Sequence, residues 1–187
     1  PFVVGEKIKA GVALGDLDGN GKDDIVFGSD GDFLDVVLDN LTHAPGFPID
    51  LGNNLRSEPA ILDIGSEKII LIGCNDNNFY AINYSDAPLR FVIPTGDDVY
   101  TSAAFKGSGN NTEIYFGSDD GNIYAVDING NALDGFPYNV DGEVVGSVAI
   151  ADLDNDNSLD IIAVNSSGQL YGLSDSGSLL DYFPINY

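Results

Sequence analysis

The chain has 187 residues, which is enough for one domain with a hydrophobic core. Its 30 Asp and Glu residues outnumber 7 Lys and Arg residues, and the resulting formal charge of −23 argues against nucleic acid and anionic membranes as partners. A hydrophobic fraction of 43% excludes a disordered chain, and the longest apolar run, Ile69–Ile72, is too short for membrane insertion.

The composition favours turns over helices. The acidic residues are 25 Asp and 5 Glu, and the chain also holds 23 Gly, whereas helices favour Glu, Lys, Ala and Leu. A single cysteine, Cys74, excludes an internal disulfide framework. We therefore expect an all-β protein.

Four similar segments follow one another along the chain. Aligning them on Ala13, Ala60, Ala103 and Ala149 gives a repeat of 43 to 47 residues. This is the length of a propeller blade built from four strands.

Each repeat reads as a series of short strands separated by turn residues. In the third repeat the expected strands cover residues 102–105, 112–118, 122–127 and 135–140. The second strand recurs at 23–29, 67–74 and 159–166, and the third at 32–37, 78–83 and 169–174. The sequence predicts a β-propeller of four blades, each of four antiparallel strands, at about 1–47, 48–93, 94–136 and 137–187. These blades would form either a closed four-blade ring or part of a ring of seven or eight blades.

Two loops carry oxygen-bearing side chains at alternate positions. In the first repeat these residues are Asp16, Asp18, Asn20 and Asp24, with Lys22 offering its backbone carbonyl; in the fourth they are Asp152, Asp154, Asp156 and Asp160, with Ser158 at the carbonyl position. Ca²⁺ is bound by six to eight oxygens of these kinds. A hairpin turn also uses Asp and Asn, but it does not require several converging carboxylates, which repel one another. We therefore predict two Ca²⁺ sites.

The second and third repeats lack this pattern. Asp63 aligns with Asp16, but Gly65 stands where the first loop has Asp18, and Lys106 aligns with the first ligand position in the third repeat. We expect these loops to be free of metal, so that the two sites act as structural clamps.

The segments "DLDGNGKDDIVFGSDG" and "DLDNDNSLDIIAVNSSG" resemble the calcium loop and following strand of FG-GAP (VCBS-type) β-propeller repeats, which occur in integrin α-subunits and secreted microbial proteins. The stretch "DDGNIYAVDINGNALDGFP" is also similar to PQQ-like propeller repeats, but the chain lacks the tryptophan typical of them. The first resemblance implies an extracellular module, secreted or on the cell surface, that acts in adhesion, ligand binding or scaffolding.

No catalytic motif stands out, and we expect a protein that is not an enzyme. The one histidine, His43, has no paired carboxylate or cysteine at nucleophile or metal spacing, and no nucleophile elbow or P-loop is present. Two alternatives remain: an accessory propeller of a secreted polysaccharide-acting enzyme, or a structural subunit of an extracellular assembly.

Several features bear on partners. Tyr80, Tyr124 and Tyr171 recur on the third strand, where packing between blades is favoured over stacking on sugars. Four N-x-[ST] sequons begin at Asn40, Asn83, Asn110 and Asn165. The expected ligand is a protein or a glycan, and the exposed faces of the terminal blades would need the remainder of a parent chain or another copy of this one.

Overall fold

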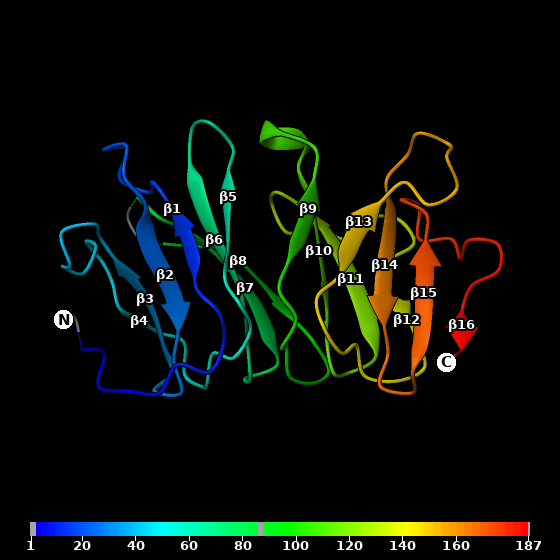
Figure 1. The fold of residues 1–187 in the computed structure, drawn as a ribbon, viewed down its shortest axis with the longest axis horizontal. Helices are drawn as coiled ribbons and strands as arrows, with labels where there is room; N and C mark the ends of the chain where they lie inside the picture. Colours follow the sequence, from blue (N-terminus) through cyan, green and yellow to red (C-terminus); the bar gives the residue numbers. More distant parts are fainter. Residues whose placement is uncertain (1–2, 86–87, 187) are drawn as a thin grey trace.

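The computed structural model describes residues 3–85 and 88–186, and these form four antiparallel sheets of four strands each (Figure 1). Blade 1 contains β1 (Ala13–Gly15), β2 (Asp24–Gly28), β3 (Phe33–Val37) and β4 (Ile49–Asp50); blade 2 contains β5 (Ala60–Asp63), β6 (Lys68–Cys74), β7 (Asn78–Asn83) and β8 (Leu89–Pro94). Blade 3 contains β9 (Ala104–Lys106), β10 (Glu113–Gly117), β11 (Asn122–Asp127) and β12 (Tyr138–Asn139), with a 3₁₀ helix, η1 (Gly109–Asn111), between its first two strands. Blade 4 contains β13 (Ala149–Ala151), β14 (Asp160–Val164), β15 (Gln169–Leu173) and β16 (Ile185–Asn186). The predicted all-β architecture of four four-stranded blades is confirmed.

The sheets of blades 1 and 3 extend beyond the approximate boundaries predicted at 47/48 and 136/137, whereas β8 ends at Pro94, next to the boundary predicted at 93/94. β4 pairs with β3, and β12 pairs with β11, so the strand that follows each Phe-Pro step closes the preceding sheet. The Phe47–Pro48, Phe136–Pro137 and Phe183–Pro184 peptide bonds are all cis and lie just before such a strand. Residues 1–2, 86–87 and 187, which the predicted ranges include, lie outside the described residues.

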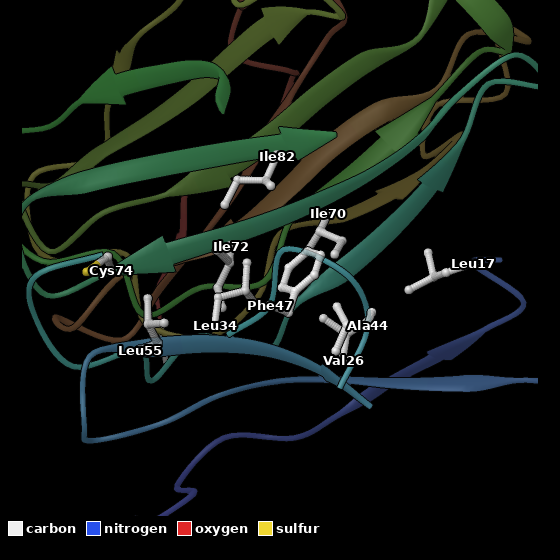
Figure 2. Packing of buried hydrophobic residues seen from close by; sticks show 11 residues of the cluster. Leu17, Val26, Leu34, Ala44, Phe47, Leu55, Ile70, Ile72, Cys74 and Ile82 are labelled. Carbon is white, nitrogen blue, oxygen red and sulfur yellow. The ribbon is translucent and has the colours of Figure 1, made fainter. Parts of the chain in front are cut away.

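The hydrophobic core is divided among the three junctions between neighbouring blades. One cluster joins blades 1 and 2, where Val26 and Leu34 meet Ile70 and Ile72 (Figure 2). A second cluster joins blades 2 and 3, and a third joins blades 3 and 4. The central strand β6 contributes to two of them, because Ile69 and Leu71 belong to the second cluster whereas Ile70 and Ile72 belong to the first. This burial on both faces explains the uninterrupted apolar run in the sequence.

A glycine on the second strand allows each junction to close. A Cβ on Gly28 would lie 2.4 Å from the Cβ of Leu55, and one on Gly73 would lie 2.4 Å from the carbonyl oxygen of Val99. Gly117 has the same relation to Val144, whose Cγ1 would be 2.3 Å away. Leu55, Val99 and Val144 are fully buried residues of the linkers between blades. The glycines are therefore required because the next linker packs directly on the strand.

The four blades form an open arc. They lie side by side in chain order, with the two ends of the chain at opposite ends of the row (Figure 1). The strands nearest one another across junctions are β1 with β5 and β9 with β13, and no strand of blade 1 packs extensively on blade 4 in the described chain. One copy of the chain therefore does not close into a four-blade ring, which was one of the two predicted alternatives. Within the described residues, no helix is long and apolar enough to cross a bilayer.

Candidate metal centre

The first acidic loop joins β1 to β2 and brings three of its predicted ligands together. Carboxylate oxygens of Asp16, Asp18 and Asp24 lie within 4.8 Å of one another. Asp24 is fully buried and accepts hydrogen bonds from the backbone N–H groups of Leu17 at 3.0 Å and Asp39 at 3.1 Å. This carboxylate anchors the loop to its own blade.

The remaining two predicted ligands are held by local hydrogen bonds. The side-chain oxygen of Asn20 accepts from the backbone N–H of Lys22 at 2.9 Å, and its amide nitrogen donates to Asp18 at 3.0 Å and Asp39 at 3.1 Å. The ammonium group of Lys22 pairs with Asp39 at 2.5 Å, and this hydrogen bond raises the pKa of Lys22 and lowers that of Asp39. Asn20 and Lys22 are therefore tied to the hairpin that follows β3.

The second acidic loop has the same construction between β13 and β14. Carboxylate oxygens of Asp152, Asp154 and Asp156 lie within 4.8 Å of one another. Asp160 lies outside this group: it is buried and accepts from the backbone N–H of Leu153 at 2.8 Å, as Asp24 does from Leu17. The backbone N–H of Ser158 donates to Asp156 at 2.7 Å.

The two loops also share a backbone conformation. Gly19 and Gly21 have φ values of 80° and 84°, and Asn155 and Asn157, at the same positions of the second loop, have 62° and 71°. Gly and Asn are the residues that adopt this left-handed region most readily. The two sequences therefore reach the same loop shape with different residues.

The donor sets fit a hard cation. All the converging atoms are oxygens, and those of each triad lie within 4.8 Å of one another, close enough for all three to reach one Ca²⁺ ion at about 2.4 Å. Their carboxylates are close enough to repel one another, and a divalent cation would remove that repulsion.

The loops of blades 2 and 3 bring no such group together among the described residues. In blade 2, Ile69 takes the place of Asp24, because it pairs with Leu62 as Asp24 pairs with Gly15. Ile69 is a buried apolar residue and offers no oxygen. In blade 3, strand pairing corrects the predicted alignment by one residue.

Ala104, and not Ala103, is the counterpart of Ala13, because it pairs with Tyr115 as Ala13 pairs with Val26. Lys106 is therefore equivalent to Gly15, and Gly107 stands at the first ligand position. The ammonium group of Lys106 pairs with Glu113, the counterpart of Asp24, at 3.2 Å.

The first loop also contacts the neighbouring blade. The ammonium group of Lys68, in blade 2, donates to the backbone carbonyl of Asp16. Leu17 packs in the core between blades 1 and 2, where it is 4% exposed. A cation in this loop would therefore stabilise both its own blade and the first junction.

His43 has a buried partner that the sequence reasoning missed. Its Nδ1 lies 2.9 Å from Oδ1 of Asp35, and both residues line a pocket of about 270 Å³ on the outer side of blade 1. The two residues come from β3 and from the segment that bridges back to it at Val37. Their separation of eight residues gave no recognisable motif.

The acidic pairs Asp97–Asp98 and Asp119–Asp120 lie close together at the junction of blades 2 and 3. Asp119 donates its backbone N–H to the carbonyl of Asp98 at 2.9 Å. Burial, together with the negative charges of Glu143, Asp97, Asp98 and Asp120, raises the pKa of Asp119 to about 6. The charged form of this carboxyl is therefore disfavoured in the folded chain.

We expect Asp119→Asn to raise the melting temperature at pH 7.5. The pKa of Asp119 is about 6 in the folded chain, against an ordinary value of 3.8. The charged carboxylate therefore destabilises the fold at pH 7.5, and this cost diminishes as the pH falls from about 6 toward 4. The gain from Asp119→Asn should accordingly shrink toward pH 4. Thermal melts of both proteins across pH 4–8 measure this, with the exposed Asp134→Asn as control. A gain that does not change with pH would contradict the assignment.

The recurring tyrosines pack between blades, as predicted. Tyr80 and Tyr124 lie against the first and second core clusters, and Tyr171 belongs to the third. Of the sequons, Asn165 is buried, and its amide donates to the carbonyl of Val140 at 2.7 Å. Asn165 is therefore inaccessible to glycosylation in the folded chain, whereas Asn40 and Asn110 are exposed.

Comparison with solved structures decides the fold. BBS1N, crystallised in complex with ARL6DN, aligns with a TM-score of 0.69 and 13% identity over 97% of this chain and 55% of that one. The fold is that of a β-propeller. The computationally designed propeller Ika8 aligns with a TM-score of 0.64 and 15% identity over 90% of this chain and 46% of that one.

The computationally designed propeller Ika4 aligns with a TM-score of 0.61 and 17% identity over 90% of this chain and 91% of that one. This propeller chain thus spans about half the length of BBS1N and of Ika8. No protein-family model matches it, and no curated protein sequence is similar to it.

Proposed function

We propose that this β-propeller is a calcium-binding, non-catalytic module of a secreted or cell-surface protein, where it acts in adhesion, ligand binding or scaffolding. The observation that carries the proposal is the pair of acidic triads in equivalent loops of blades 1 and 4, in each of which three carboxylate oxygens lie within 4.8 Å of one another. The resemblance of both loops to FG-GAP repeats supports the same reading.

Each residue of the loops would have a defined task. In blade 1 the side chains of Asp16, Asp18 and Asp24 would hold the cation, and in blade 4 those of Asp152 and Asp154 would act with Asp156. Asn20 and Asp160 would complete the sets, and Lys22 and Ser158 would offer backbone carbonyls. Bound calcium would supply positive charge that cancels the repulsion among these carboxylates.

The proposed extracellular location suits the affinity expected of such loops. Exposed loops of this kind in extracellular modules have dissociation constants of about 10⁻⁴–10⁻³ M, a range in which calcium outside the cell, but not in the cytosol, fills the sites. The net charge of −23 leaves cations and neutral or basic ligands as the favoured partners, and a protein or a glycan remains the proposed ligand.

Calcium titration of the metal-free chain by isothermal calorimetry tests the proposal. We expect about two bound Ca²⁺ ions per chain, with weaker binding of Mg²⁺ because it requires stricter octahedral geometry. Asp18→Asn and Asp154→Asn should each remove one site, whereas Asp134→Asn should keep both. Absence of binding, or full binding by the Asp18→Asn/Asp154→Asn double variant, would refute a metal role for the loops.

A further inference from the structure

The face of blade 4 that points away from blade 3, here called its outer face, carries apolar residues at positions that are buried in the other blades. Strand pairing makes Ile162 and Leu170 of blade 4 the counterparts of Tyr115 and Ile123, which are fully buried against blade 4 at the third junction. Ile162 and Leu170 belong to none of the three clusters and are partly exposed, as is Ile185 on β16, which pairs with Leu170.

The second acidic loop, in blade 4, is also more exposed than the first acidic loop, in blade 1. Leu17 of the first loop is 4% exposed, because blade 2 covers it, whereas its counterpart Leu153 is 40% exposed. Leu153 also lines a cavity of about 610 Å³ together with residues 179–183. This face of blade 4 therefore has the composition of a blade junction but lacks the second blade.

The opposite end of the arc exposes the complementary half of a junction. At each internal junction a linker residue, Leu55, Val99 or Val144, is 0% exposed and donates its backbone N–H to the preceding blade at 3.0–3.2 Å. The counterpart before blade 1 is Ile8, which is 41% exposed.

The segment around Ile8 is hydrogen-bonded to blade 1 in the same way as the linkers between blades are bonded to the blade that follows them. Lys7 accepts a hydrogen bond from the backbone N–H of Asp30 at 2.8 Å, as Asn54 does from Asn75 at 3.0 Å in the next blade. Leu14 of β1 is also exposed. Blade 1 thus presents an apolar linker residue and an apolar strand that no blade of the described residues covers.

We propose that the outer face of blade 4 binds the outer face of blade 1 of a second copy, and that two such junctions close a ring of two chains. A second copy is the occupant because each chain carries both halves of the junction at opposite ends of an open arc. One arc aligns with 46% of Ika8 and 55% of BBS1N, so two arcs together have about the length of either chain. The two junctions are related by a two-fold axis, which closes the assembly.

Charge sets the conditions under which the ring forms. Blade 1 and the segment before it carry Lys7, Lys9 and Lys22, whereas residues 107–187 contain no Lys or Arg. Acidic residues nevertheless outnumber these lysines at both ends, so the two ends repel each other at low ionic strength. Calcium or high salt should therefore favour association.

One residue distinguishes this junction from the internal ones. Gly28, Gly73 and Gly117 let the next linker approach closely, but their counterpart in blade 4 is Val164, which is 41% exposed. A Val side chain holds the Ile8 linker of the second copy farther away, which weakens the contact. Val164→Gly should therefore strengthen the association, opposite to the usual effect of removing an apolar side chain from an interface.

Sedimentation equilibrium tests the proposal with the full chain at about 10–500 µM, a range that resolves micromolar association. Measurements in millimolar calcium should show a mass of twice the 19.7 kDa chain. Leu170→Glu and Ile185→Glu should give monomers with unchanged circular dichroism, and Leu89→Glu, at an exposed apolar site on β8, should remain a dimer. Val164→Gly should lower the dissociation constant by about tenfold, as expected when a steric barrier at an apolar contact is removed.

A monomeric parent chain, a mass that grows without limit, a dimer that survives both Glu variants, or weaker association of Val164→Gly would each overturn the proposal. The proposal is independent of the metal role. In about 0.5 M NaCl with EGTA, charge repulsion is screened without calcium, so a dimer there supports the junction even if the loops bind no metal. Conversely, calcium binding by a monomer would keep the proposed function and refute the ring.

Discussion

Phe116→Ala should lower the free energy of unfolding by about 3–5 kcal/mol, the range for truncating a fully buried aromatic ring. Phe116 has no exposed surface and lies between two other rings at the junction of blades 2 and 3. Its ring stacks on Phe79 with centroids 3.9 Å apart and on Tyr124 with centroids 5.0 Å apart. The substitution removes both stacking interactions at once and leaves a cavity in the core between blades 2 and 3.

Urea denaturation followed by circular dichroism measures this loss, and Phe105→Ala is the matched control. Phe105 lies on β9 of the same blade with 40% of its surface exposed, so its truncation should have little effect on stability. Equal losses for Phe116→Ala and Phe105→Ala would show that the junction is not the main source of stability in this arc.

Calcium should raise the melting temperature by about 5–15 °C relative to EGTA. With dissociation constants of about 10⁻⁴–10⁻³ M, 5 mM calcium stabilises the folded chain by about 1–2 kcal/mol per site. For a chain of this length, about 2–4 °C accompanies each kcal/mol. The physical cause is the neutralisation of the carboxylates of Asp16, Asp18 and Asp24 and of their counterparts in blade 4.

Scanning calorimetry with millimolar calcium or EGTA gives this shift. Asp18→Ala and Asp154→Ala should each remove part of it, and the double variant should melt at the same temperature in both buffers. Asp63→Ala, in the loop of blade 2 where buried Ile69 replaces the anchoring carboxylate, should keep the full shift. A shift that persists in the double variant would indicate that calcium acts elsewhere on the acidic surface.

The fold could be predicted from sequence because its determinants are local and recur. The apolar runs around Ile69–Ile72 and the turn residues between them define strands without knowledge of distant contacts. The extent of blade 1 could not be predicted because the two-residue strand β4 after Phe47–Pro48 is too short to show a pattern, and only its pairing with β3 assigns it to blade 1. The shift between Ala103 and Ala104 has a similar origin, since pairing with Tyr115 sets the register.

The candidate site was predictable to the same extent. The candidate ligands that lie within one loop, such as Asp152, Asp154 and Asp156, are close in sequence, and their spacing alone predicted that they lie together. Groups assembled by the fold were not. Asp35 and His43 meet through a bridge next to β3, and Asp119 meets Asp98 across a blade junction. Such contacts depend on sheet packing, which no short spacing in the sequence encodes.

The close contact between a glycine and the following linker has a consequence for how chains of this kind can change in length. Gly28, Gly73 and Gly117 each lie closest to the linker residue that leads into the next blade. The position of a blade is therefore set by its immediate predecessor, and stability accumulates through nearest neighbours. Duplication or loss of one 43-to-47-residue unit would leave every other junction intact. Evolution can thus alter the number of blades by single genetic events without redesigning the core.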